Sequence, residues 1–117
     1  MTSVLIVDDH PAFRASARRL LERDGFRVVG EADDGASGIE LARKLDPDLI
    51  LLDVVLPDTT GFDVAEELRS ERSEVVLVSS RTSADLGPRL DVTSALGFIP
   101  KEELTSEAVR ALLDTGG

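Results

Sequence analysis

Five short apolar runs recur along the chain, and each is rich in Val, Leu or Ile. They extend from Val4 to Val7, Arg27 to Val29, Leu49 to Leu52, Val75 to Val78 and Gly97 to Ile99, beginning 23, 22, 26 and 22 residues apart. Continuous apolar runs, rather than alternation with polar residues, are typical of strands covered on both faces. The pattern therefore predicts five parallel strands with helices on either side.

The segments between these runs carry apolar residues at helical spacing. We predict helices over Pro11 to Arg23, Ala36 to Leu45, Phe62 to Arg69 and Ser106 to Leu113, the last with Thr105 as its N-cap. Between Arg81 and Leu96 the pair Gly87-Pro88 interrupts the pattern, so we expect a helix starting near Pro88 or a partly irregular segment. The alternation predicts one doubly wound α/β domain with a five-stranded parallel sheet over residues 1–117.

Composition narrows the classes of function. The 117 residues include 13 Lys and Arg against 23 Asp and Glu, a net charge of −10, which argues against direct binding to nucleic acid or an anionic membrane. The absence of cysteine excludes disulfides, thiolate zinc sites and cysteine nucleophiles. Runs such as Leu49 to Leu52 are far shorter than the ~20 residues of a membrane span, and no signal-peptide core precedes the first strand. We expect a soluble cytoplasmic protein whose partners are proteins or cations.

Polar residues follow four of the five apolar runs. In chain order they are Asp8 and Asp9, then Asp53, then Ser79 and Ser80, then Pro100 and Lys101. In an open parallel sheet, ligands bind beyond the carboxyl ends of the strands, and the order 2-1-3-4-5 makes the first and third strands neighbours. Three carboxylates meeting there need a cation, a proton or an ammonium group to offset their repulsion. Lys101, one of only two lysines in the chain, can supply the ammonium group. A ligand set made only of oxygen atoms suits Mg²⁺ best.

Taken together, these residues resemble the signatures of the response-regulator receiver domain of two-component signalling. The similarity covers essentially the whole chain and rests on Val7-Asp8-Asp9-His10-Pro11, on Leu51-Leu52-Asp53-Val54-Val55-Leu56-Pro57 with Gly61, on Val78-Ser79-Ser80, and on Gly97-Phe98-Ile99-Pro100-Lys101. The resemblance implies a flavodoxin-like (βα)₅ fold with strand order 2-1-3-4-5. It also implies a phosphoacceptor that promotes its own phosphorylation and dephosphorylation, rather than an enzyme.

The resemblance assigns the phosphoacceptor and the metal ligands. Asp53 would take a phosphoryl group from the phosphohistidine of a sensor histidine kinase or a phosphotransfer protein, which is reasonable chemistry for a carboxylate once its charge is offset. Asp9 would ligate Mg²⁺ directly and Asp8 directly or through water. Asp53 and the backbone carbonyl of Val55 would complete the protein ligands.

The resemblance also implies a switch and an output. Lys101 would pair with the carboxylates and then with a phosphoryl oxygen, while the Ser79 hydroxyl would donate to another and draw in Phe98. The modification adds about −1.5 to −2 of charge, enough to bias a two-state surface. The output would be a downstream protein or an attached effector. The opening from Asp8 to Pro11 is common among receivers joined to helix-turn-helix regulators, which supports the attached effector. Homodimers through the first or last helices also occur in the family.

Several of these residues have a second interpretation. Phe98 could be a static core residue, Ser80 a loop residue rather than part of the pocket mouth, and His10 a surface or helix-entry residue rather than a ligand. Val55 places an apolar side chain beside the acceptor, where it could limit the approach of water, and Arg81 would lie on the opposite rim. Four arginines at helical spacing form either a solvated face or a docking stripe: Arg14, Arg18, Arg19 and Arg23.

Three other functions compete with the phosphoacceptor. A nucleotide or flavin binder would need a Gly-rich or Ser-rich loop after the first strand, where this chain has two acids. A hydrolase with an Asp nucleophile would tend to carry an Asp-x-Asp pattern there, whereas Asp8 and Asp9 are adjacent. The third alternative is a phosphorylation-independent, receiver-like interaction module, which would be marked by loss of Asp53, Lys101 or one of the paired acids. None of these residues is missing.

Overall fold

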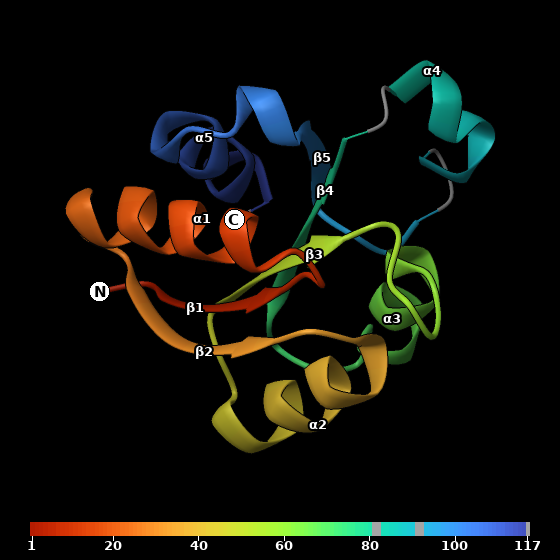
Figure 1. The fold of residues 1–117 in the computed structure, drawn as a ribbon, viewed down its shortest axis with the longest axis horizontal. Coiled ribbons are helices and arrows are strands. Elements are labelled where there is room, and N and C mark those ends of the chain that lie inside the picture. The colour runs from red at the N-terminus through yellow and green to blue at the C-terminus, as the bar shows by residue number, and fades with distance from the viewer. Residues whose placement is uncertain (81–82, 91–92, 117) are drawn as a thin grey trace.

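A computed structural model describes residues 1–80, 83–90 and 93–116, which form a five-stranded parallel sheet between two layers of helices (Figure 1). The elements are β1 (Ser3–Val7), α1 (Pro11–Arg23), β2 (Arg27–Ala32), α2 (Gly35–Leu45), β3 (Leu49–Asp53), α3 (Gly61–Glu67), β4 (Glu74–Ser79), α4 (Ser83–Leu86), the 3₁₀ turn η1 (Gly87–Leu90), β5 (Gly97–Pro100), the 3₁₀ turn η2 (Lys101–Glu103) and α5 (Ser106–Gly116). The strand order β2-β1-β3-β4-β5 is the predicted one.

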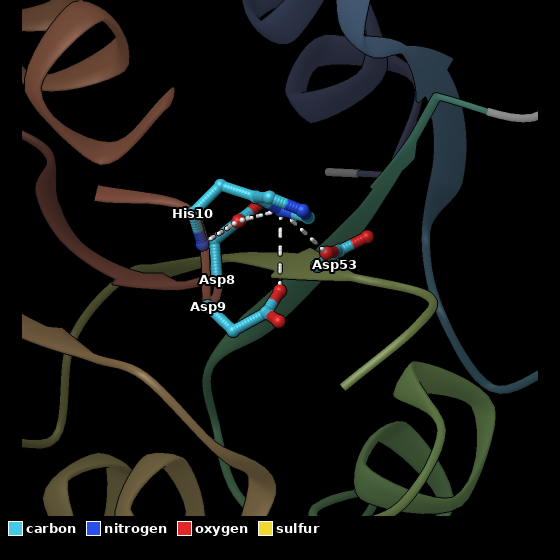
Figure 2. A group of neighbouring side chains, drawn as sticks. All are labelled: Asp8, Asp9, His10 and Asp53. Atoms are coloured by element: carbon cyan, nitrogen blue, oxygen red, sulfur yellow. Dashed lines mark hydrogen bonds and ion pairs between the residues drawn. The ribbon is translucent and has the colours of Figure 1, made fainter. Parts of the chain in front are cut away.

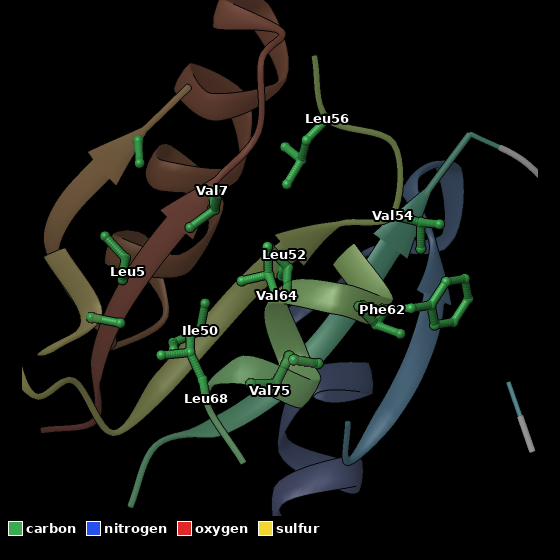
Figure 3. Close-up of a cluster of buried hydrophobic side chains, with 14 residues drawn as sticks. Leu5, Val7, Ile50, Leu52, Val54, Leu56, Phe62, Val64, Leu68 and Val75 are labelled. Carbon is green, nitrogen blue, oxygen red and sulfur yellow. The ribbon is translucent and has the colours of Figure 1, made fainter. Parts of the chain in front are cut away.

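The sheet separates two apolar cores. Residues such as Leu5, Ile50 and Leu77 face α2 and α3 in one core, part of which Figure 3 shows. The intervening residues, such as Ile6 and Leu51, face α1 and α5 in the other core. Because side chains of a strand point alternately to its two faces, helices on both faces require apolar residues at every position. This requirement explains the continuous apolar runs in the sequence.

The predicted strands and helices are present, with differences at their ends. β2 continues to Ala32, beyond the predicted end, because its pairing with β1 resumes after an irregularity and reaches Val7. α3 ends at Glu67, earlier than predicted. The predicted N-cap of α5 is confirmed, since Thr105 Oγ1 accepts a hydrogen bond from Ala108 N at 3.0 Å.

The segment around Pro88 contains two short helical turns. α4 ends at Leu86, and the 3₁₀ turn η1 begins at Gly87, next to Pro88, whereas no α-helix begins there in the described part of the segment. Gly87 adopts a left-handed φ of 63°, a conformation that glycine accepts readily and that breaks the helix before the proline. The expectation of a partly irregular segment is confirmed, while the predicted place of Arg81 lies outside the described residues.

No helix in the described ranges is both long enough and apolar enough to cross a bilayer.

Candidate functional site

The pairing of the two central strands places two acids side by side. Val7 at the end of β1 is in register with Leu52 of β3, so the next residues, Asp8 and Asp53, leave the same edge of the sheet together. Asp8 is completely buried and Asp53 is 2% exposed. Figure 2 shows both carboxylates joined by dashed lines to the same His10 ring nitrogen. The predicted meeting of the acids from the first and third strands is confirmed.

Lys101 brings a positive charge to this acid pair. It follows β5, two strands away from β3, and its Nζ lies 2.7 Å from Asp8 Oδ2 and 3.4 Å from Asp53 Oδ2. The Phe13 ring also helps to hold it, because Nζ lies 4.5 Å from the centre of that ring. Its side chain is largely buried. Two buried carboxylates therefore share one ammonium group.

The charge balance is incomplete, and the pKa of Asp53 reflects this. Burial raises the pKa of Asp53 above its usual range, and the neighbouring charge of Asp8 raises it further. The ammonium group of Lys101 and the N–H of Val55, which donates to Asp53 Oδ1 at 3.3 Å, oppose that rise without cancelling it. The pocket therefore disfavours the ionised form of Asp53 unless more positive charge enters.

The two oxygens of Asp8 have different partners. Asp8 Oδ1 accepts a hydrogen bond from His10 N at 2.8 Å. Asp8 Oδ2 is buried and forms the 2.7 Å ion pair with Lys101 Nζ. One ammonium group offsets only one of the two buried negative charges, so a further cation would lower the cost of burying the other.

His10 and Asp9 close the group on its exposed side. His10 is the N-cap of α1, as the helix-entry interpretation predicted, but its ring also lies over the acids (Figure 2). Its Nδ1 is 3.0 Å from Asp8 Oδ1, 3.1 Å from Asp9 Oδ1 and 3.8 Å from Asp53 Oδ2. The possible ligand atoms of these four residues lie within 4.8 Å of one another. Sequence reasoning missed this position of the ring, although His10 directly follows the acid pair.

The remaining predicted site residues come from the loop after β3 and from the ends of β4 and β5. Val55 lies two residues beyond Asp53, and its side chain is exposed. Ser79 ends β4 and is buried; because Asp53 pairs with Val78, Ser79 is one position further toward the same edge. Ser80 is exposed. Phe98 pairs with Leu77 and packs, partly buried, against the core beneath α2 and α3.

The arginines of α1 divide into two kinds. Arg19 and Arg23 are exposed, as expected for a solvated face. Arg14 instead donates from Nη1 to the backbone carbonyl of Asp8 at 2.6 Å and from Nε to Glu31 at 3.1 Å. Arg18 also binds Glu31, at 2.9 Å. Arg14 thus braces the loop that carries the acid pair, a role that helical spacing could not reveal because its partners belong to other elements.

The fold and the site together define a class of protein. The chain combines a doubly wound parallel sheet with a buried acid pair and a lysine at its carboxyl edge, where the strand order reverses and ligands bind in folds of this type. Residues 4–113 match the family model of the response regulator receiver domain, and the chain belongs to this family. The acidic cluster is consistent with the metal site of receiver domains. Membership in the family sets aside the nucleotide-binding and hydrolase alternatives.

Known proteins similar to this chain include regulators and their receiver domains. A putative transcriptional regulator of Pseudomonas aeruginosa is 44% identical over 113 residues, covering 95% of this chain and 55% of the relative. The nitrate/nitrite response regulator protein NarP of Escherichia coli is 43% identical over 115 residues, covering 92% of this chain and 53% of the relative. The solved receiver domain of the putative response regulator NarL from Mycobacterium tuberculosis superposes with a TM-score of 0.87 at 38% identity. The match covers 97% of this chain and 94% of the solved chain. The chain spans about half the length of these curated relatives.

Proposed function

We propose that this receiver domain accepts a phosphoryl group on Asp53 from the phosphohistidine of a sensor histidine kinase or a phosphotransfer protein. The observation that carries the proposal is the buried pair of Asp8 and Asp53 with Lys101 Nζ 3.4 Å from Asp53 Oδ2. A carboxylate in that position is a nucleophile whose surroundings are short of positive charge, so the arrangement favours binding of a cation together with the incoming group.

In the transfer step an Asp53 carboxylate oxygen attacks phosphorus. The new O–P bond forms as the P–N bond to the donor histidine breaks, and the histidine nitrogen leaves with the electron pair. Lys101 supplies a fixed ammonium beside the acceptor, where it would pair with a phosphoryl oxygen as negative charge accumulates. Burial of Asp53 limits the access of water to the acyl phosphate that results.

The metal that we propose for this site is Mg²⁺, held by Asp8, Asp9, Asp53 and the backbone carbonyl of Val55. Carboxylate and carbonyl oxygens are the ligands that Mg²⁺ prefers, and Asp8, Asp9 and Asp53 bring carboxylate oxygens within 4.8 Å of one another. When bound, Mg²⁺ would neutralise charge on the phosphoryl oxygens during transfer.

The proposed output is a rearrangement that begins at Ser79. Its position at the end of β4 suits a hydroxyl that donates to a phosphoryl oxygen on Asp53, and Phe98 on the adjacent β5 is only partly buried. We propose that Phe98 changes its burial with this movement. The readout would pass to a downstream protein, to a second copy of the chain, or to an attached effector, as the relatives' descriptions as transcriptional regulators suggest. We place this activity in the cytoplasm.

Incubation with acetyl phosphate and Mg²⁺, followed by intact-mass measurement, tests the proposal. We expect the wild-type chain to gain one phosphoryl group and Asp53→Asn to gain none. Asp33→Asn is the matched control, because it removes an exposed acid from a loop at the same edge and should be modified like the wild type. Absence of modification in all three proteins would contradict the proposal and favour the phosphorylation-independent interaction module.

A further inference from the structure

Asp58 joins the loop after Asp53 to a different helix. The residue lies in the β3–α3 loop, residues 54–60, which also carries Val55. Asp58 Oδ1 accepts a hydrogen bond from Gly35 N at 2.8 Å, and Oδ2 accepts one from Ala36 N at 3.0 Å. Gly35 and Ala36 are the first residues of α2. Both oxygens of an exposed acid are thus engaged by the end of a helix more than 20 residues away in sequence.

The helix does not depend on Asp58 for its capping. Asp34 is the N-cap of α2, and its side chain accepts a hydrogen bond from Ser37 N at 2.8 Å. This local bond already performs the usual function of an N-cap residue. The hydrogen bonds from Gly35 N and Ala36 N lower the pKa of Asp58. A negative charge at the start of a helix also interacts favourably with the helix dipole. What Asp58 adds beyond a cap is a connection to the loop.

The loop and the helix end are packed with little free space. A Cβ atom added at Gly35 would lie 2.3 Å from Thr59 Cγ2, and one added at Gly61 would lie 2.5 Å from the backbone oxygen of Asp53. Within the loop, Leu56 N donates to Thr59 O at 3.2 Å, and Gly61 N donates to Val54 O at 2.7 Å. The turn is therefore stiff in itself, so anchoring its tip to α2 fixes the direction in which its backbone groups point.

The anchored loop is also connected to Asp53. The backbone N–H of Val55 donates to Asp53 Oδ1, and Val55 forms a bridge with Thr60 across the loop. A movement of the loop tip would therefore shift both the Val55 carbonyl and one hydrogen bond of the acceptor. We propose that Asp58 is a positioning residue that holds the β3–α3 loop against α2, so that the Val55 carbonyl is presented to the cation beside Asp53. This inference rests on the metal site of the proposed function.

Calorimetric titration with Mg²⁺ tests the role of Asp58. We expect Asp58→Ala to weaken Mg²⁺ binding about tenfold, the effect of removing a residue that orients a ligand. Asp34→Ala is the matched control, because it removes the same charge from the same helix end but no contact with the loop. We expect its Mg²⁺ affinity to stay close to that of the wild type, although both variants lose thermal stability.

A third variant separates hydrogen bonding from charge. Asp58→Asn is as neutral as Asp58→Ala but keeps one acceptor oxygen for the α2 N–H groups, so we expect an intermediate Mg²⁺ affinity. It also carries the test if Asp58→Ala does not fold. Unchanged affinity in the Asp58 variants, or an equal loss in Asp34→Ala, would overturn the positioning role alone. Failure of the wild type to bind Mg²⁺ would instead contradict the proposed metal site.

Discussion

Asp48 and Asp53 lie at opposite ends of the same strand, yet the protein surrounds these two carboxylates differently. Asp48, just before β3, accepts hydrogen bonds from Ser3 N at 2.8 Å and Ser3 Oγ at 3.1 Å, and from Arg72 Nη1 at 2.8 Å. These donors lower the pKa of Asp48 to about 2. Asp53 has a raised pKa, because it is buried beside Asp8.

The difference shows how one residue type can stabilise the fold at one edge of the sheet and provide reactivity at the other. At the amino-terminal edge each carboxylate oxygen of Asp48 meets a donor, and Arg72 extends the contact to Asp46 at 2.8 Å. At the carboxyl-terminal edge, the two carboxylates of Asp8 and Asp53 share the single ammonium group of Lys101, so one negative charge is not offset. We infer that the carboxylate at the amino-terminal edge stabilises the fold, while the acids at the carboxyl-terminal edge destabilise it and provide a binding site.

The largest expected effect comes from the amino-terminal edge. Asp48→Asn replaces an acceptor oxygen with an amide that faces donors, so we expect the free energy of unfolding to fall by about 1–2 kcal/mol. This loss of stability is smaller than the loss expected for a fully buried carboxylate, because the Asp48 side chain is 40% exposed and water screens its charge. Urea denaturation measures the change, with the exposed Asp33→Asn as control. A variant as stable as the wild type would remove the contrast between the edges.

At the carboxyl-terminal edge we expect a substitution of the acid to raise the free energy of unfolding rather than lower it. Asp53→Asn keeps the shape of the side chain and removes a buried negative charge beside Asp8, so the free energy of unfolding at pH 7 should rise, on the order of 1 kcal/mol. The raised pKa means that ionised Asp53 opposes folding. That opposition is absent below the unfolded value of 3.8 and develops as the pH rises through the folded pKa.

The pH dependence of the same urea denaturation series sharpens this prediction. The gap between Asp53→Asn and the wild type should close as the pH falls from 7 toward 4. The contribution of Asp48 has the reverse sign and persists in this range, since it is present above 3.8 and is lost as the pH falls through about 2. A gap for Asp53→Asn that does not change with pH would show that packing, rather than charge, causes it.

The smallest expected effect concerns the His10 ring. Its Nδ1 lies among the oxygens of Asp8, Asp9 and Asp53, in the space that a cation bound by them would need. We expect His10→Ala to strengthen Mg²⁺ binding about threefold, the size of losing an exposed polar contact. Calorimetry of both proteins at one pH measures it. Weaker binding in the variant would mean that the ring acts as a ligand rather than a competitor.

Much of the sheet and its reactive edge could be predicted because their signals are local. Five apolar runs predicted five strands, and the polar residues directly after them predicted that Asp8, Asp53 and Lys101 would meet. The end of the α4 region was less predictable, because Gly87 and Pro88 mark a break without telling on which side the helix lies. The roles of Ser79 and Phe98 remain predictions, since they concern a change between two states.

The order of apolar and polar residues by itself determined the layered α/β architecture and the acids at the carboxyl-terminal edge, because strand periodicity and chain direction are properties of neighbouring residues. Only the tertiary structure decided the contacts of Arg14 with the Asp8 carbonyl, of the His10 ring with three carboxylates, and of Asp58 with the start of α2. Each of these contacts joins groups whose directions depend on how separate elements pack. A hydrogen bond requires a defined distance and angle, and the spacing of residues along the chain does not specify either.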